Sequence, residues 1–173
     1  MFVHLRLHSE FSVVDGTLRI DEAVSAAAAD AQPAMAITDL SNMFGAVKFY
    51  KEARGAGVKP VLGAEVFVQG LGGPAAPLPG QPQMPVSPTA QSLPRVLLLV
   101  QNKQGYLNMS ELIARAYTQN VLTTGGKQLA VVKLAWLKEL NEGLIALSGA
   151  QAGPVGQALV QGDTARAHDV ALQ

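Results

Sequence analysis

Cysteine is absent from this 173-residue sequence. Without cysteine the chain forms no disulfide, and a zinc site built on thiolate ligands is excluded. A small secreted scaffold held by disulfides is therefore excluded, and a cytoplasmic protein is the default expectation. Charged residues are few, at 15% of the chain, whereas 49% are hydrophobic. This composition is typical of a globular domain with a buried core.

An excess of positive charge is also missing. Lys plus Arg and Asp plus Glu both number 13, so the formal net charge is zero. No bulk basic field is present to hold a phosphate backbone, and the aromatic residues, at 5%, are too few for a base-stacking platform. We therefore expect no direct nucleic-acid binding from this segment.

Long apolar segments are absent as well. The N-terminal residues read MFVHLRLHSEF, and no apolar signal core follows them. No run of 18 apolar residues occurs anywhere in the sequence. We expect neither a secretion signal nor a membrane-spanning segment.

What the sequence does contain is an alternation of strand and helix patterns. Residues 2–7 alternate between apolar and nitrogen-bearing side chains, as a strand with one apolar face would. Strands that alternate with helices predict a parallel α/β fold. Five strands fall short of a closed (β/α) barrel, which typically needs about 250 residues. The predicted strands are 2–7, 34–38, 61–68, 96–100 and 144–148, and the predicted helices are 21–31, 44–53, 106–117, 134–140, 154–160 and 164–172.

One stretch interrupts this rhythm. Residues 70–94 hold seven of the ten prolines, together with several glycines. Proline lacks the amide hydrogen that a sheet or helix requires, so this stretch neither pairs in a sheet nor continues a helix. We interpret residues 70–94 as a flexible surface insertion between two strands, because the strand–helix alternation resumes after it.

Polar side chains that could bind a ligand or take part in catalysis lie near the predicted strand ends. In parallel α/β folds, active residues gather at the carboxyl ends of the strands. His8 and Asp39 follow predicted strands, Glu65 lies within one, and Arg95 precedes one, which fits the rule poorly. The first three of these residues also have a structural alternative. His8 suits a hydrogen-bonded core histidine, Glu65 a solvated strand residue and Asp39 a helix N-cap.

Five segments of the sequence occur in a recognisable order. They read HLRLHSEFSVVDG, AITDLSNMFGAVKFYKEA, GVKPVLGAEVFV, QGYLNMSELIARAY and LNEGLIALSG. In this order they closely resemble the PHP (polymerase and histidinol phosphatase) domain with which bacterial DNA polymerase III alpha subunits begin. The resemblance implies one PHP-type domain over residues 1–173, cut short at its end. The implied fold is an incomplete, distorted (β/α) barrel with parallel strands and outer helices.

The resemblance also implies a metal site that this sequence has lost. Family members with an intact site hold metal ions through His-x-His-x-x-x-Ser, Thr-Asp-His and Gly-x-Glu elements, and through a histidine that opens the fourth strand. Here arginine stands at positions 6 and 95 and leucine at position 40, in place of three histidines. The vestigial metal-site positions are therefore Arg6, His8, Asp15, Asp39, Leu40, Glu65 and Arg95.

These replacements remove metal ligands rather than exchange them. A ligand needs a lone pair, which neutral imidazole has and guanidinium lacks. We therefore expect no catalytic residue and no bound metal or other cofactor in this segment. We further hypothesise that Arg6 and Arg95 replace the positive charge of the metal by pairing with Glu65, Asp39 or Asp15.

The function that the resemblance implies is a non-catalytic domain of the replicative DNA polymerase. Such a domain stabilises the polymerase and docks the proofreading exonuclease subunit, while the full-length nucleotidyltransferase carries its active site elsewhere. The expected partners are the rest of the alpha subunit and the exonuclease subunit. Two alternatives stay open: an active metal-dependent phosphoesterase or exonuclease of the same fold, using zinc or manganese, and a stand-alone binding module.

Overall fold

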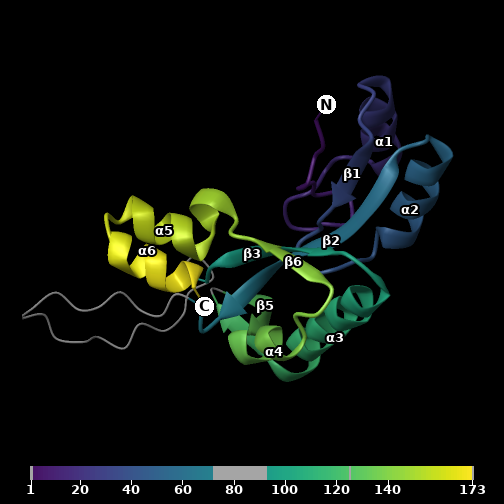
Figure 1. The fold of residues 1–173 in the computed structure, drawn as a ribbon. Coiled ribbons are helices and arrows are strands. Elements are labelled where there is room, and N and C mark those ends of the chain that lie inside the picture. Colours follow the sequence, from purple (N-terminus) through teal and green to yellow (C-terminus); the bar gives the residue numbers. More distant parts are fainter. Residues whose placement is uncertain (1, 72–92, 125, 173) are drawn as a thin grey trace, which may run out of the picture.

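The computed structural model describes residues 2–71, 93–124 and 126–172 (Figure 1). Strands and helices alternate along most of this part of the chain, which confirms the predicted α/β class. Its elements are α1 (Ile20–Ala29), β1 (Ala34–Ile37), α2 (Ala46–Gly55), β2 (Lys59–Gln69), β3 (Arg95–Val100), α3 (Lys103–Gln119), β4 (Val121–Thr124), β5 (Lys127–Lys133), α4 (Leu134–Glu139), β6 (Leu144–Leu147), a 3₁₀ turn (Ala150–Ala152), α5 (Pro154–Val160) and α6 (Thr164–Ala171).

The longest strand, β2, is the axis of the sheet. Its first half pairs in parallel with β1, from Ala34 opposite Lys59 to Ile37 opposite Leu62. Its second half lies between β3 and β5, so the sheet has the order β4-β5-β2-β3-β6, with β1 beside β2 off this path. The sheet of the described residues does not close into a barrel, because β4 and β6 are its two edges.

The two faces of the sheet have different coverings. On one face, alternate residues of β2 and β3 (Ala64, Val66, Val68, Val96 and Leu98) pack against Met109, Leu112 and Ala116 of α3. Burial of a side chain as large as Leu or Met contributes about 1.5–3 kcal/mol, so this contact fixes α3 against β2 and β3. Figure 1 shows α3 and α4 on this side of the sheet. Because side chains alternate along a strand, Glu65 and Phe67 of β2 point to the opposite face.

A second core forms where α1 and α2 pack against β1 and the start of β2. Ile20 and Val24 of α1 meet Phe49 and Ala53 of α2 in this cluster. The helix α1 begins with acidic residues in its first turn, which favour the positive end of the helix dipole. This second core supports β1 and the loop that follows it.

The expected parallel pairing is found only in part. β1–β2 and β2–β5 are parallel, whereas β2–β3, β3–β6 and β4–β5 are antiparallel. A parallel neighbour needs a crossover connection, usually a helix, and the proline-rich segment that joins β2 to β3 does not suit one. The antiparallel orientation also removes the difficulty with Arg95. The start of β3 lies beside the end of β2, with Arg95 opposite Phe67.

The predicted N-terminal strand is wrong as a regular element. The segment runs beside β1, where the Ala36 amide donates to the His4 carbonyl (2.8 Å) and the Thr38 amide to the Leu7 carbonyl (2.8 Å). Between these two hydrogen bonds the N-terminal segment advances by three residues, from His4 to Leu7, whereas the other strand advances by two, from Ala36 to Thr38. An unmatched residue of this kind breaks the ladder, as a bulge does, and leaves only an isolated bridge at His4.

The predicted insertion, the hairpin of β4 and β5, and the expected absence of a membrane-spanning segment can also be compared with the structure. The predicted insertion lies between consecutive strands β2 and β3, and residues 72–92 of it fall outside the described part of the chain. The hairpin of β4 and β5 was not predicted. Among the described residues, no helix is long and apolar enough to cross a membrane.

Candidate functional site

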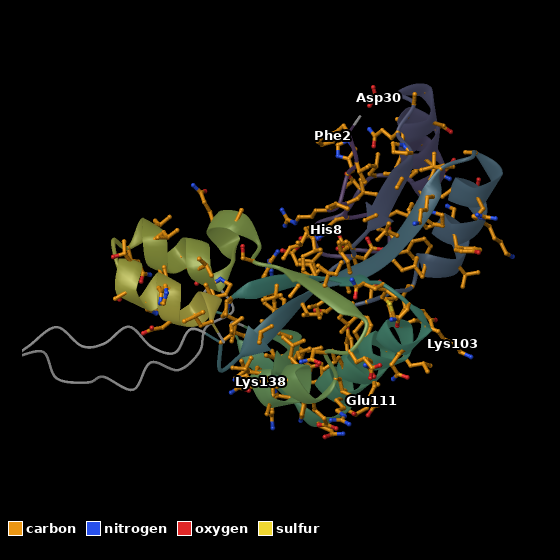
Figure 2. All side chains as sticks on the ribbon, viewed as in Figure 1. Phe2, His8, Asp30, Lys103, Glu111 and Lys138 are labelled. Atoms are coloured by element: carbon orange, nitrogen blue, oxygen red, sulfur yellow. The ribbon has the colours of Figure 1, made fainter. Side chains whose placement is uncertain are left out.

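Segments far apart in the sequence bring the vestigial positions together. The loop 8–16 follows the N-terminal segment, Asp39 and Leu40 follow β1, Glu65 lies in β2, and Arg95 opens β3. The backbone of Leu40 bridges that of Glu65, and the Ser41 amide donates to the Glu65 carbonyl at 2.7 Å. Figure 2 shows His8 over the middle of the sheet, between the end with α1 and α2 and the end with α5 and α6.

The buried carboxylate of Glu65 is the centre of the cluster. Its side chain is only 1% exposed, and the Arg6 Nη2 donates to both of its oxygens, at 2.9 and 3.1 Å. The His8 Nε2 lies 2.7 Å from Glu65 Oε2, at an ion-pair distance but without hydrogen-bond geometry. Burial raises the pKa of Glu65, but His8 and Arg6 outweigh burial and hold that pKa below its ordinary value. Glu65 is therefore ionised and compensated by two cationic groups.

His8 lies between two carboxylates. Its Nε2 faces Glu65, and its Nδ1 lies 2.9 Å from the Asp15 Oδ1. The contact with Glu65 is the main cause that raises the pKa of His8 above 6.5, and Asp15 adds to it, while burial opposes both. The acceptor beside each ring nitrogen favours protonation of the ring, and the protonated ring has no lone pair in its plane to offer a metal.

Asp15 connects His8 to the start of β3. Its Oδ1 also accepts a hydrogen bond from the Ser12 hydroxyl at 2.7 Å, and its Oδ2 lies 3.6 Å from the Arg95 Nη1. The Arg95 guanidinium lies over the Phe67 ring, 4.9 Å from its centroid. A guanidinium above an aromatic face gains a cation–π attraction, so Phe67 and Asp15 together orient Arg95.

Asp39 has a different environment from the one hypothesised. Among the ion pairs of the described residues, none joins an arginine to Asp39. The amide and hydroxyl of Ser9 donate to its two oxygens, at 2.6 and 2.9 Å. Burial raises the pKa of Asp39, and the hydrogen bonds from Ser9 oppose that rise without cancelling it. Asp39 therefore anchors the loop that carries His8 onto the end of β1.

Leu40 lies outside the polar cluster. Its half-buried side chain packs against the apolar cluster that contains Phe67 and Val131. Its backbone amide donates to the Ser12 hydroxyl at 3.0 Å. This position therefore contributes an apolar contact and a backbone hydrogen bond, while its side chain has no donor atom for a metal.

These contacts do not fit a metal cluster. The Arg6 guanidinium occupies both oxygens of Glu65, and both nitrogens of His8 face carboxylates. In the described part of the chain, no three His, Cys, Asp or Glu side chains are arranged to hold a metal ion. The donor set presents cations where a metal would need lone pairs, so these residues do not suit a metal-dependent step.

Two serines matter more than the sequence patterns suggested. Ser9 and Ser12 are both fully buried, and their hydroxyls bind Asp39 and Asp15. Ser12 stood in the expected motif without an assigned contact, and Ser9 was not singled out. The available signal was a serine directly after His8, since short hydroxyl side chains commonly bind nearby backbone and carboxylate groups in loops.

Comparison with known proteins identifies the family of the chain. The sequence profile of the PHP domain matches residues 4–173. The chain is similar to the DNA polymerase III subunit alpha of Pseudomonas fluorescens (41% identity over 99% of this chain and 13% of that protein), of Escherichia coli K12 (40% over 95% and 12%) and of Vibrio cholerae (39% over 94% and 12%). It thus spans only about an eighth of the length of these relatives. With the family's profile matched over nearly its whole length, the chain belongs to the PHP-domain family.

Proposed function

We propose that this chain is the PHP domain of a replicative DNA polymerase alpha subunit, acting in the cytoplasm during DNA replication as a non-catalytic scaffold. In this role it stabilises the polymerase and docks the proofreading exonuclease subunit. The similarity to DNA polymerase III alpha subunits supports the assignment to a polymerase. The full-length relatives are about eight times longer, and DNA synthesis would belong to the rest of such a protein.

One observation carries the non-catalytic role. A single guanidinium nitrogen of Arg6 lies within 3.1 Å of both Glu65 oxygens. A hydrolase with several metal ions needs this carboxylate as a ligand, because the ions generate hydroxide and clamp the reacting oxygens. A permanent cation at Glu65 competes with a metal and repels it.

The surrounding charges support the same conclusion. The cations of the cluster (Arg6, His8 and Arg95) lie on or near its carboxylates, so Glu65 is neutralised without a metal. These pairs offset part of the desolvation cost that an unpaired buried carboxylate would have. The cluster is therefore suited to hold the loop 8–16, β2 and β3 together.

Metal content tests the proposal. The chain is purified without a histidine tag, and bound zinc, manganese and iron are measured by inductively coupled plasma mass spectrometry. The expected result is less than about a tenth of an equivalent of metal, because the ligand set is incomplete. Two or more equivalents, together with metal-dependent release of phosphate from a chromogenic ester, would instead identify an active phosphoesterase.

Docking is tested separately. The exonuclease subunit of the same organism is titrated against the chain by isothermal titration calorimetry, and circular dichroism confirms that the chain is folded. Binding with a dissociation constant at or below about 1–10 µM supports the scaffold role. A complete absence of binding to the chain and to the full-length alpha subunit contradicts it.

A further inference from the structure

The outer face of α2 exposes apolar side chains. Phe44, just before the helix, is 72% exposed, and Val47 and Tyr50 are 67% and 51% exposed. Helix geometry places Val47, Tyr50, Lys51 and Arg54 in one stripe, because residues three, four and seven positions apart share a face. We refer to these four residues and Phe44 as the α2 outer face. In Figure 1, α2 lies on the outside of the molecule.

The fold holds these side chains outward. The opposite side of α2 is buried in the core through Ala46, Phe49 and Ala53, so the helix cannot rotate to cover Val47 and Tyr50. The Phe44 amide donates to the Asn42 Oδ1 at 3.0 Å, which fixes the turn before the helix. The exposure is therefore a property of the packed structure and not of a loosely attached helix.

The charges on this face are unpaired. Lys48, on the flank of α2, makes an ion pair with Glu10 at 2.6 Å. Lys51 and Arg54 make no ion pair with any described residue, although both are exposed. The α2 outer face thus combines a phenyl ring, a phenol and an isopropyl group with two cations that make no ion pair with a described residue.

We propose that the α2 outer face is a docking surface for an acidic, amphipathic segment of a partner protein. This inference rests on the proposed scaffold role and adds the surface and the chemistry of the partner. Aromatic residues and arginine are enriched at protein interfaces, and an amphipathic helical peptide can pack its apolar side chains against the exposed stripe of another helix. Carboxylates on the partner complement Lys51 and Arg54.

Other occupants fit less well. Two copies of the chain that meet through this face around a two-fold axis would place four cations in one interface, and the α2 outer face has no carboxylate to pair with them. Nucleic acid needs several basic contacts to a phosphate backbone, and two cations beside three apolar side chains do not supply them. A protein segment that carries both apolar and acidic side chains satisfies both halves of the face.

The test uses the whole chain and two designed helical peptides. One peptide has a leucine stripe at positions i, i+3, i+4 and i+7 flanked by glutamates, and the other has lysines in place of the glutamates. Binding is followed by fluorescence anisotropy. We expect the glutamate peptide to bind with a dissociation constant of about 10–100 µM, at least about tenfold more tightly than the lysine peptide. We also expect this preference to shrink as salt is added.

Variants locate the binding on the molecule. Val47→Glu should weaken the glutamate peptide at least about tenfold, whereas Val160→Glu, at a residue of α5 that is 72% exposed, is the matched control and should not. Arg54→Glu should weaken the glutamate peptide, whereas Lys103→Glu on α3 should leave it unchanged. Circular dichroism confirms that each variant is folded.

Several results would overturn the inference. Equal binding of the two peptides would contradict the proposal. Equal effects of Val47→Glu and Val160→Glu would also contradict it, because the peptide would then not bind at the α2 outer face. Displacement of the glutamate peptide by vesicles containing phosphatidylserine assigns the face to a membrane, and a dimer that Val47→Glu dissociates in sedimentation assigns it to a second copy. If the unaltered chain does not bind the exonuclease subunit, the result counts against the proposed function and not against the docking surface.

Discussion

One guanidinium nitrogen of Arg6 donates to both carboxylate oxygens of Glu65, although Arg6 lies at the surface and Glu65 in the interior. The side chain of Arg6 is 55% exposed and that of Glu65 is 1% exposed. The two residues are 59 positions apart in the sequence, so their contact ties the N-terminal segment to the middle of β2. A buried carboxylate that loses its partner retains its desolvation cost.

Replacement of Arg6 by alanine should therefore destabilise the fold. We expect the free energy of unfolding to fall by about 1–2 kcal/mol, less than the 3–5 kcal/mol of a fully buried pair, because water screens the exposed Arg6. Urea unfolding followed by circular dichroism measures this change. Arg19→Ala is the control, since Arg19 and Asp21 are both more than half exposed.

A double-mutant cycle separates the ion pair from general effects of the substitution. In the background of Glu65→Gln, the loss caused by Arg6→Ala should shrink, because no buried charge is left to compensate. An unchanged melting temperature for Arg6→Ala would falsify the charge-replacement hypothesis.

The position of His8 predicts a stability that depends on pH. The pKa of His8 is raised in the folded protein by Glu65 and Asp15, so folding favours the protonated ring. This stabilisation is fully present below the unfolded value, near 6.5, and is lost as the pH rises through the higher folded pKa. The free energy of unfolding should therefore decrease from pH 6.5 upward.

Substitution of His8 by glutamine should flatten this dependence. Glutamine does not ionise, so the variant should be less stable at pH 6.5 and show a smaller decrease toward pH 8.5. Chemical denaturation at a series of pH values gives both curves. Parallel curves would mean that His8 does not cause the decrease. Below pH 4.5 the unaltered protein should lose stability, because the pKa of Glu65 is lowered in the folded state and its protonation favours the unfolded chain. This loss should be smaller in His8→Gln, because His8 is one of the two groups that lower the pKa of Glu65.

Most helices and strands could be predicted from the sequence, because apolar residues recur at helical spacing or form short apolar runs between turn residues. The hairpin of β4 and β5 is the exception. Val121 and Leu122 precede Thr-Thr-Gly-Gly, and an alternating segment follows. A pair of glycines between two short strand patterns is a hairpin signal, so this element was predictable from the sequence.

The orientation of β3 was not predictable in the same way. A strand pattern fixes which residues share a face but not the direction of the neighbouring strand. Only the antiparallel pairing brings Arg95 beside Phe67 and within 3.6 Å of Asp15. The same limit applies to the charge pairs. The sequence named the arginines and three carboxylates, but only the packing assigns Arg6 to Glu65 and Ser9 to Asp39.

The end of α1 offers a stabilising substitution. Ala31 has a φ of 52°, and it occupies the left-handed position of a Schellman motif, in which the Gln32 amide donates to the Ala27 carbonyl and the Ala31 amide to the Ala28 carbonyl. Glycine adopts this conformation without the steric strain that alanine has there. Ala31→Gly should therefore raise the free energy of unfolding by about 0.5–1 kcal/mol.

The matched control is Ala26→Gly, at an exposed residue inside the same helix. There glycine brings only its entropic cost, and we expect a loss of about 1 kcal/mol. Urea unfolding measures both variants. A loss of stability in Ala31→Gly as large as that in Ala26→Gly would show that the left-handed conformation at Ala31 carries no strain.

The contact of α3 with the turn before β6 predicts a glycine that tolerates no side chain. A Cβ on Gly105 would lie 1.9 Å from the Gly143 carbonyl oxygen, which is far inside van der Waals contact with a backbone atom. The Gly105 amide also donates to the Asn102 Oδ1 that caps α3, so the helix start cannot shift without loss of its cap. Gly105→Ala should lower the free energy of unfolding by about 1–3 kcal/mol, as overpacking of a tight contact does.

The matched control is Gly55→Ala, near the end of α2, where no atom lies within 4 Å of the added Cβ. This substitution should be neutral or should raise the free energy of unfolding by up to about 1 kcal/mol. Thermal unfolding of the two variants decides the point, since equal melting temperatures would mean that α3 moves away from Gly143 at little cost.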